Sequence, residues 1–420
     1  MTEPSSPYPQ LRVNSDRFRA DFDELAQIGA TPEGGVNRLA LSPEDLLARA
    51  WFADKIEAAG LTVRDDDAGN LSGVLRSRDP AAKTLMIGSH LDSVPNGGRF
   101  DGATGVLAAL ECLRVIKENN VTLPVHLEAI SFTDDEGCWR SLFGSRAVAG
   151  LLTEDDIEDR RVDNAPFRAA LTRAGIDPRT VFRAERPPSS LAGYFELHIE
   201  QGERLARADK DIGVVVGIVG RTTYRFTFYG QAAHSGTTDM YRRRDALRGA
   251  ALFIVRAHDA VREKYGDGVF NCGGVVVKPG AFNIIPSEAD LLVECRHVNA
   301  RLMSEMEMMI VQIARECAAT HGLNFNSEQV AHVPAAHMDE RIMATIEQAA
   351  QQLNLSTLNL TSYAGHDSQI LSRIVPCGML FIPSIDGISH NPREFTHWEN
   401  VIQGANTLLH AVLNYALAET

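Results

Sequence analysis

The sequence lacks several features that mark whole classes of protein. Its 420 residues contain no tract dominated by Lys and Arg, and its formal net charge is −14. Nucleic acid and anionic membrane surfaces are therefore not expected as partners, because both are bound through clustered positive charge. No apolar run approaches the roughly 20 residues that a membrane-spanning helix needs. The first residues, MTEPSSPYPQLRVNSDRF, lack the basic-then-apolar order of a signal peptide.

Closely spaced cysteines are also missing. The six Cys lie at positions 112, 138, 272, 295, 317 and 377, and no two of them form a C-x-x-C pair. This scatter is typical of free thiols in a reducing compartment and argues against a disulfide framework. Together with the polar first residues, it predicts a cytoplasmic protein.

The composition that is present, 44% hydrophobic and 23% charged residues, is typical of a folded protein. The length exceeds that of one ordinary core and predicts two domains. Two helices are expected, within 14–29 and 42–60. The second has Ser42 as its N-cap, Pro43 at its first position and Gly60 beyond its end.

Strand and helix patterns alternate in the next part of the chain. The strand-like run 83–90 is followed by helical spacing over 103–119 and by a second strand-like run, 125–132. This order predicts βαβ units in a largely parallel sheet, and hence an α/β fold. Ligands gather at the carboxyl ends of such strands, where His90 and the acidic run 134–136 fall.

The pattern changes near residue 214. Strand, helix, two strands, helix and strand follow one another over about 115 residues, which predicts a small α+β sandwich. After residue 335 the chain returns to a helix, a buried strand and a C-terminal helix. We therefore predict an α/β domain of residues 1–215 and 335–420, interrupted by an inserted α+β domain of residues 216–334.

Five side chains stand out as candidate metal ligands, because they follow probable strands or lie in turns: His90, Asp101, Glu136, His198 and His390. Of these, His198 is expected at the centre of a strand. Taken singly, each also fits a structural role, an Asx turn or an exposed acidic loop. Together, three imidazoles and two carboxylates suit Zn, Mn, Co or Ni and not a thiolate site. If one Asp bridges, two metal ions can lie about 3.5–4 Å apart.

The turn SHLDSVPNGGRFDGATG (89–105) has a glycine content that this interpretation explains. Asp92 could accept the second imidazole N–H of His90 and so fix its tautomer; an ordinary turn Asp is the alternative. The glycines would let the backbone that carries Asp101 pass close to the other ligands.

Nine motifs resemble the dinuclear-metal aminoacylase/carboxypeptidase superfamily. Within it they resemble the hydantoinase/carbamoylase amidases, a branch of N-carbamoyl-L-amino-acid hydrolases, β-ureidopropionases and allantoate amidohydrolases. The motifs follow the family's order between about residues 87 and 397: GSHLDSVPNGGRFDGATGV, FTDDEG, GSRAVAG, HIEQG, GVVVGIVG, GQAAHSGTTDMYRRRDAL, NIIPSEADLLVECRH, AGHDSQ and GISHNPRE. The resemblance implies a two-domain peptidase-like fold, with an α/β catalytic domain and an inserted sandwich that acts as lid and dimerisation domain.

The resemblance also implies roles for individual residues. Two divalent metal ions would be held by His90, Asp101 as the bridge, Glu136, His198 and His390. Asp92 would support the ligands, and Asp135 occupies the position of the general acid/base. The residues expected to contact substrate are Gln201, His234, Asn283 and Arg296, with His234 and Asn283 reaching across a homodimer interface.

The chemistry of three side chains fits these roles, with structural alternatives. Arg296 could bind a substrate carboxylate with two hydrogen bonds, or form a surface ion pair. His234 could donate to a developing oxyanion, or cap a loop. Gly365 lies in the turn AGHDS, where a substrate-lining role and an ordinary turn are equally consistent.

The sequence departs from the family at the acid/base, which is Glu in the family and Asp135 here. Asp is shorter by one methylene, roughly 1.5 Å of reach, and proton transfer needs hydrogen-bond geometry. Three interpretations stay open: a shifted loop, another carboxylate such as Asp134, or a weak or specialised activity. Trp139 and Phe143 also differ from the usual continuation and belong either to the core or to a pocket wall.

The expected function is cleavage of the carbamoyl C–N bond of N-carbamoyl-L-amino acids or related ureido acids by a metal-activated water. The substrate would be small and carry a carboxylate. One alternative is an N-acyl-amino-acid amidohydrolase or dipeptidase of the same superfamily. The other is a metal-retaining protein that binds its ligand with little turnover.

Overall fold

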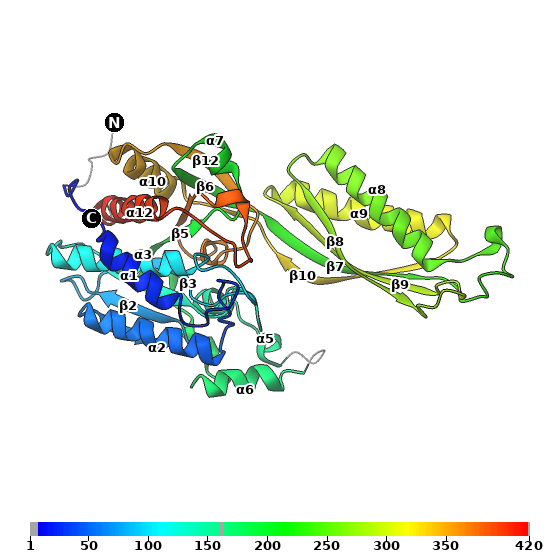
Figure 1. The fold of residues 1–420 in the computed structure, drawn as a ribbon, viewed down its shortest axis with the longest axis horizontal. Helices are drawn as coiled ribbons and strands as arrows, with labels where there is room; N and C mark the ends of the chain where they lie inside the picture. The colour runs from blue at the N-terminus through cyan, green and yellow to red at the C-terminus, as the bar shows by residue number, and fades with distance from the viewer. Residues whose placement is uncertain (1–6, 159–162, 419–420) are drawn as a thin grey trace. The chain divides into compact units, whose positions relative to one another are not determined.

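The computed structural model describes residues 7–158 and 163–418, which form two compact units (Figure 1). Unit 1 comprises the described residues up to Val216 and from His337 onward. Unit 2 comprises Gly217–Ala336. The chain therefore leaves unit 1 once, builds unit 2 and returns.

Unit 1 is built on a nine-stranded sheet with the order β1-β2-β4-β3-β5-β13-β6-β11, in which β12 also pairs with β6. The central neighbours β4, β3, β5 and β13 run parallel, and antiparallel strands flank them. The parallel strands are buried along their whole length, as expected where both faces of a sheet are covered. The strands are β1 (Thr62–Asp65), β2 (Leu71–Leu75), β3 (Thr84–His90), β4 (His126–Phe132), β5 (Leu191–Ile199), β6 (Ile212–Ile218), β11 (Ala336–His337), β12 (Thr357–Ser362) and β13 (Cys377–Ile382).

Helices α1, α2, α3, α10 and α12 contribute apolar side chains to the main core of unit 1. The predicted N-cap of α2 is confirmed, since Ser42 Oγ accepts a hydrogen bond from the backbone N–H of Asp45 at 3.2 Å. The helices are α1 (Ser15–Leu25), α2 (Pro43–Ala58), α3 (Ala103–Glu118), α4 (Phe143–Val148), α5 (Glu154–Glu158), α6 (Ala165–Arg173), α7 (Arg204–Ala208), α10 (Glu340–Gln352), α11 (Asp367–Leu371) and α12 (Trp398–Ala418), with 3-10 turns η1 (Val181–Ala184), η2 (Pro188–Ser190) and η4 (Ile385–Gly387).

Unit 2 is an antiparallel four-stranded sheet with the order β10-β7-β9-β8 and two helices on one face (Figure 1). Its own core includes Phe226, Phe228, Phe253, Leu291 and Met306, all fully buried. Along the chain the elements are β7 (Gly220–Tyr229), the 3-10 turn η3 (Met240–Arg242), α8 (Ala246–Lys264), β8 (Val269–Lys278), β9 (Glu288–His297), α9 (Ala300–Thr320) and β10 (Asn324–Val333).

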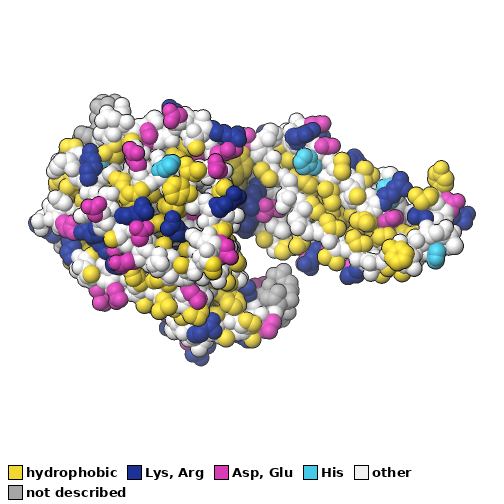
Figure 2. All heavy atoms as spheres, viewed as in Figure 1, with side chains coloured by type: hydrophobic (Ala, Val, Ile, Leu, Met, Phe, Trp, Pro, Cys, Tyr) yellow, Lys and Arg dark blue, Asp and Glu magenta, His cyan; other side chains and the backbone are white. Residues whose placement is uncertain are grey.

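The surface agrees with the charge pattern of the sequence. Acidic and basic side chains are interspersed over the visible face of unit 1 (Figure 2). Within the part of the chain that the structure describes, no helix combines the length and apolar character needed to traverse a bilayer.

Candidate metal centre

Three strand ends bring the candidate ligands together in unit 1. His90 is the last residue of β3, the acidic run Asp134–Glu136 follows β4, and His198 is the penultimate residue of β5. The expectation that His198 lies at a strand centre is wrong, because β5 ends one residue later. Since β4, β3 and β5 are parallel neighbours, these ends meet at one edge of the sheet.

The candidate ligands form two groups that share Asp101. The first group is His90, Asp101 and His198, and the second is Asp101, Glu136 and His390; within each, the ligand atoms lie within 4.8 Å of one another. Asp101 Oδ1 is 3.0 Å from His198 Nε2 and 3.5 Å from His90 Nε2. Asp101 Oδ2 is 3.5 Å from His390 Nε2. One oxygen of Asp101 therefore faces each group.

Backbone carbonyls select the tautomers of the two buried imidazoles. His90 Nδ1 lies 3.0 Å from the carbonyl oxygen of Asp92, and His198 Nδ1 lies 2.9 Å from that of Ile199. A carbonyl only accepts, so each Nδ1 carries the hydrogen and donates it. Each Nε2 then presents a lone pair toward Asp101, as a metal-binding imidazole requires.

Asp92 supports the site differently from the expectation. Its carboxylate is 3.8 Å from His90 Nδ1, farther away than its own main-chain carbonyl. The carboxylate accepts instead from the backbone N–H groups of Asp135, at 3.4 Å, and Glu136, at 3.2 Å. Asp92 therefore anchors the acidic loop with its side chain and orients His90 with its backbone.

Asp135 lies beside the first group with its side chain held in a buried position. Its Oδ2 is 3.5 Å from His90 Nε2, and its buried Oδ1 has no hydrogen-bond partner among the described residues. Burial raises the pKa of Asp135 well above its ordinary value; His90 opposes this rise, while Asp367 adds to it. A buried carboxyl group beside the ligands with an unpartnered oxygen is suited to accepting and returning a proton.

Asp134 has a different environment from its neighbour. It is fully buried, with a positive φ of 57°, and its carboxylate accepts from the backbone N–H groups of Trp139, at 3.0 Å, and Arg140, at 2.6 Å. Through these hydrogen bonds, the Asp134 side chain stabilises the loop after β4. The geometry therefore favours Asp135 over Asp134 as the proton-transfer group.

The two aromatic residues that depart from the family pattern belong to or pack against one buried apolar cluster. Phe143 is fully buried, and Trp139 stacks on Phe167 at a centroid distance of 5.7 Å. The indole N–H of Trp139 donates to the carbonyl of Ala40 at 3.0 Å. Of the two alternatives, the structure favours the core.

Two glycines of the turn 89–105 are required by close approach. A Cβ on Gly102, which has a φ of 63°, would lie 2.4–2.5 Å from the His90 ring. A Cβ on Gly98 would lie 1.9 Å from Oε1 of Glu394. Glu394 is a residue of the site that sequence reasoning missed; its only signal is its place four residues after His390, in GISHNPRE.

The predicted substrate-contacting residues are divided between the units. In unit 1, Gln201 Nε2 donates to Asp101 Oδ2 at 2.9 Å, and Gln201 Oε1 is buried with no hydrogen-bond partner among the described residues. Gly365 precedes His366, whose ring packs edge-on to His198 with centroids 4.6 Å apart. The structure therefore places both near the candidate ligands.

The remaining predicted contacts lie in unit 2. His234 forms a β-bridge with Ile284, and the backbone N–H of Ser235 donates to the carbonyl of Asn283 at 3.0 Å, which brings His234 and Asn283 to one exposed loop region. Arg296 Nε donates to Glu294 Oε1 at 2.7 Å on β9.

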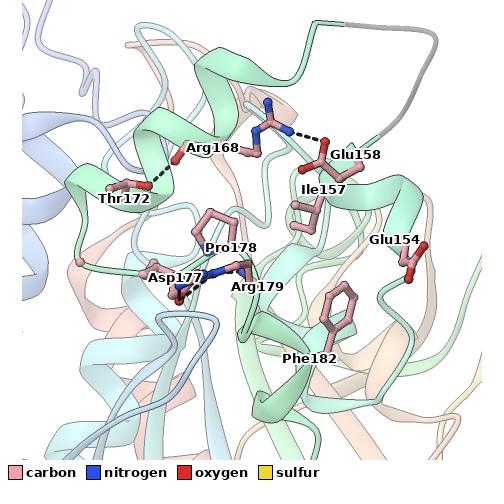
Figure 3. Close-up of a pocket in the computed structure, with 11 residues that line it drawn as sticks. Glu154, Ile157, Glu158, Arg168, Thr172, Asp177, Pro178, Arg179 and Phe182 are labelled. Atoms are coloured by element: carbon pink, nitrogen blue, oxygen red, sulfur yellow. Dashed lines mark hydrogen bonds and ion pairs between the residues drawn. The ribbon is translucent and has the colours of Figure 1, made fainter.

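A cavity of about 850 Å³ lies elsewhere in unit 1, among α5, α6 and η1 (Figure 3). Its apolar lining includes Ile157, Pro178 and Phe182. Its two arginines are engaged with acids, Arg168 with Glu158 and Arg179 with Asp177. It contains none of the candidate ligands and is separate from this site.

The donor set fits divalent metal ions of the first transition row. It offers three imidazole nitrogens and two carboxylates, the ligand types that these ions prefer. The unpartnered oxygen of Asp135 beside the first group also fits a site that holds a cation or its bound ligands.

Two N/O ligand groups at the edge of a parallel sheet are typical of metallohydrolases. Comparison with known proteins identifies the family to which the chain belongs. The model of Peptidase family M20/M25/M40 matches residues 86–414, and the chain belongs to this family. It is 36% identical to an N-carbamoyl-L-amino acid amidohydrolase of Geobacillus stearothermophilus, over 97% of this chain and 100% of that protein. It is 31% identical to an allantoate amidohydrolase of Bacillus subtilis, over 91% and 93% of the two chains.

Solved structures agree with the sequence comparisons. The crystal structure of a hydantoinase/carbamoylase family amidase from Burkholderia multivorans matches with a TM-score of 0.87 and 35% identity, covering 97% of this chain and 99% of that one. The predicted family branch and the predicted peptidase-like α/β fold are confirmed.

We expect the metal-free protein to lose stability as the pH rises from 6 to 9. The hydrogen bond to Asp101 raises the pKa of His390 to about 9, so its stabilising contribution is complete below about pH 6.5 and is lost through pH 9. Burial raises the pKa of Glu136 to about 7 and that of Asp134 to about 8. The folded state therefore keeps protons on these carboxyl groups that the unfolded chain releases near pH 4. Their contribution to the free energy of unfolding also falls as the pH rises.

Thermal unfolding of chelated protein at pH 6, 7, 8 and 9 measures this effect. The melting temperature should fall with pH, and it should fall less when a divalent metal is added, because the metal replaces the protons. A melting temperature of the metal-free protein that rises from pH 6 to 8 would contradict these pKa directions.

Proposed function

We propose that this protein hydrolyses the carbamoyl C–N bond of N-carbamoyl-L-amino acids or related ureido acids. One observation carries the proposal: Asp101 turns one oxygen toward each of two N/O ligand groups, beside a buried carboxyl group, Asp135, with an unpartnered oxygen. The relatives named as carbamoyl-amino-acid and allantoate amidohydrolases support the class of bond and substrate.

The ligand set would hold two divalent metal ions, Zn, Mn, Co or Ni, with Asp101 as the bridge. Such ions supply Lewis-acid chemistry, lowering the pKa of water and polarising a carbonyl oxygen. Asp135 accepts a proton from the water that attacks the carbamoyl carbon and returns it to the leaving nitrogen as the C–N bond breaks. The amino acid and a carbamate leave, and the carbamate decomposes to carbon dioxide and ammonia.

Five residues are proposed to bind and orient the substrate. Gln201 Oε1, which has no hydrogen-bond partner among the described residues, can accept an N–H of the ureido group, and Gly365 would line the site from the loop before His366. Arg296 would bind the substrate carboxylate, exchanging its contact with Glu294. His234 and Asn283 would contact the substrate from the partner subunit of a homodimer, with His234 donating to the developing oxyanion.

Unit 2 is the proposed dimerisation and lid domain of a cytoplasmic homodimer. Its strand β8 is at one end of the sheet order, and the described residues pair no further strand with it. Val275 and Val276 on this strand are 46% and 58% exposed. An apolar edge strand of this kind favours association with another chain.

A substrate panel tests the proposed function. Protein reconstituted separately with Mn, Zn and Co is offered an N-carbamoyl-α-amino acid, N-carbamoyl-β-alanine, allantoate and an N-acetyl amino acid, and ammonia and free amine are measured. We expect metal-dependent release of both products from one ureido substrate. Amine without ammonia, from the N-acetyl compound alone, would indicate an acylase. Saturable binding without turnover of any substrate would indicate a binding protein.

A further inference from the structure

Glu394 connects the two segments that carry Asp101 and His390. It is 3% exposed and lies between His390 and α12. Its Oε1 accepts from the backbone N–H groups of Phe100, at 3.0 Å, and Asp101, at 3.1 Å. Its Oε2 accepts from Ser389 Oγ at 2.8 Å. One side chain thus holds the backbone at Asp101 and the residue that precedes His390.

Two further features show that these segments are built around this side chain. Gly98 leaves the space that the Glu394 carboxylate fills, since a Cβ there would lie 1.9–2.5 Å from Glu394 atoms. Ser389 Oγ also lies 3.2 Å from Asp101 Oδ2, the oxygen that faces His390. The carboxylate therefore acts on both the backbone and the side chain of the shared ligand.

We propose that Glu394 is a positioning residue that sets the geometry of the second ligand group, Asp101, Glu136 and His390. The inference rests on the proposed metal centre. His390 has a φ of 53°, which is uncommon for residues other than glycine, and its half-exposed side chain is held by little packing. Asp101 lies in the loop just before α3 rather than in a strand. Neither ligand is held by a regular element, and Glu394 supplies the missing constraint.

Metal content and affinity test this role without relying on turnover. Glu394→Ala, Glu394→Gln and wild type are stripped with a chelator, reloaded with Zn or Co, dialysed and compared by elemental analysis and calorimetric titration. Wild type should bind two metal equivalents. Glu394→Ala should retain one, with the affinity for the other lowered by about 10–100-fold, as for loss of other groups that orient ligands.

The Glu394→Gln variant tests whether the hydrogen bonds of residue 394 are sufficient without its negative charge. Its amide oxygen can accept both backbone N–H groups and its NH₂ can donate to Ser389 Oγ, so we expect affinity within about threefold of wild type. Phe395→Leu is the structural control, because the Phe395 ring packs edge-on to Phe100 with centroids 5.9 Å apart between the same segments, and Phe395 belongs to neither ligand group. It should lower the melting temperature and leave metal affinity unchanged. Glu399→Ala, an exposed change in α12, should alter neither.

The outcomes distinguish this inference from the function on which it rests. Glu394→Ala binding two metals with wild-type affinity would overturn the positioning role while leaving the proposed function intact. An equal loss of affinity in Phe395→Leu would overturn it too, because general loosening would then explain the effect. Wild type that binds no divalent metal would overturn both.

Discussion

Replacing Asp135 by Asn is expected to lower kcat by about 10²–10⁴-fold, the range that general acid–base catalysis contributes. The amide keeps the size of the side chain but cannot take the proton of the attacking water. Metal content should stay at the wild-type value, because Asp135 belongs to neither ligand group. Steady-state kinetics on the substrate found by the panel, with elemental analysis of the same preparation, measure both quantities.

Two companion variants make this result interpretable. Asp54→Asn, the same chemical change at an exposed position of α2, should leave kcat unchanged. Asp135→Glu adds the methylene that the family has at this position and should retain turnover within about tenfold of wild type, since the proton-accepting group is preserved. If Asp135→Asn turns over at the wild-type rate, Asp135 is not the proton-transfer group. If wild type itself has no turnover while Asp135→Glu does, the shorter side chain explains a weak activity.

Replacing Asp101 by Ala should have the largest effect on the metal centre. Among the described residues, Asp101 alone belongs to both candidate ligand groups, and each of its oxygens faces a different group. Its loss removes a ligand from both groups and leaves the Nε2 atoms of His90 and His198 without their common partner. We expect fewer than one metal equivalent after dialysis and kcat/KM lowered by at least about 10³-fold, because Lewis-acid activation of water is lost.

The folded state must be verified independently for this variant. Chelated Asp101→Ala and chelated wild type should have the same circular dichroism spectrum, because Asp101 lies in a loop before α3 and is not one of the apolar side chains that form the core. The stabilisation that wild type gains from added metal should be absent from the variant. A variant that retains two metal equivalents and wild-type turnover would show that Asp101 does not bridge.

The periodicity of the sequence determined much of the fold. The strand patterns at 83–90 and 125–132, separated by helical spacing, are recognisable as neighbours in a parallel sheet, because a strand–helix–strand order builds βαβ units. A strand in a parallel sheet presents its C-terminal end to the ligand edge, so His90 and Glu136 could be placed at one site from the sequence alone. The order of elements in unit 2 was predicted for the same reason, since each element has its own period.

The local sequence could also identify the donor types of the site, but not the partner of each atom. Asp92 was expected to accept from His90 with its carboxylate, whereas the carbonyl of the same residue takes that role. The choice depends on the backbone path after β3 and on the N–H groups of the loop after β4, which compete for the carboxylate. No spacing within SHLDS contains that information.

Only the tertiary structure decided which residues far apart in the chain act together. Asp101 and Glu394 are separated by 293 positions, yet a carboxylate of one accepts from the backbone of the other. The sequence by itself determined the family, the α/β class and the types of candidate metal ligand, because these follow from local periodicity and motif chemistry. The sharing of Asp101, the free oxygen of Asp135 and the positioning by Glu394 depend on distances across the fold, which are set by how the strands and loops pack.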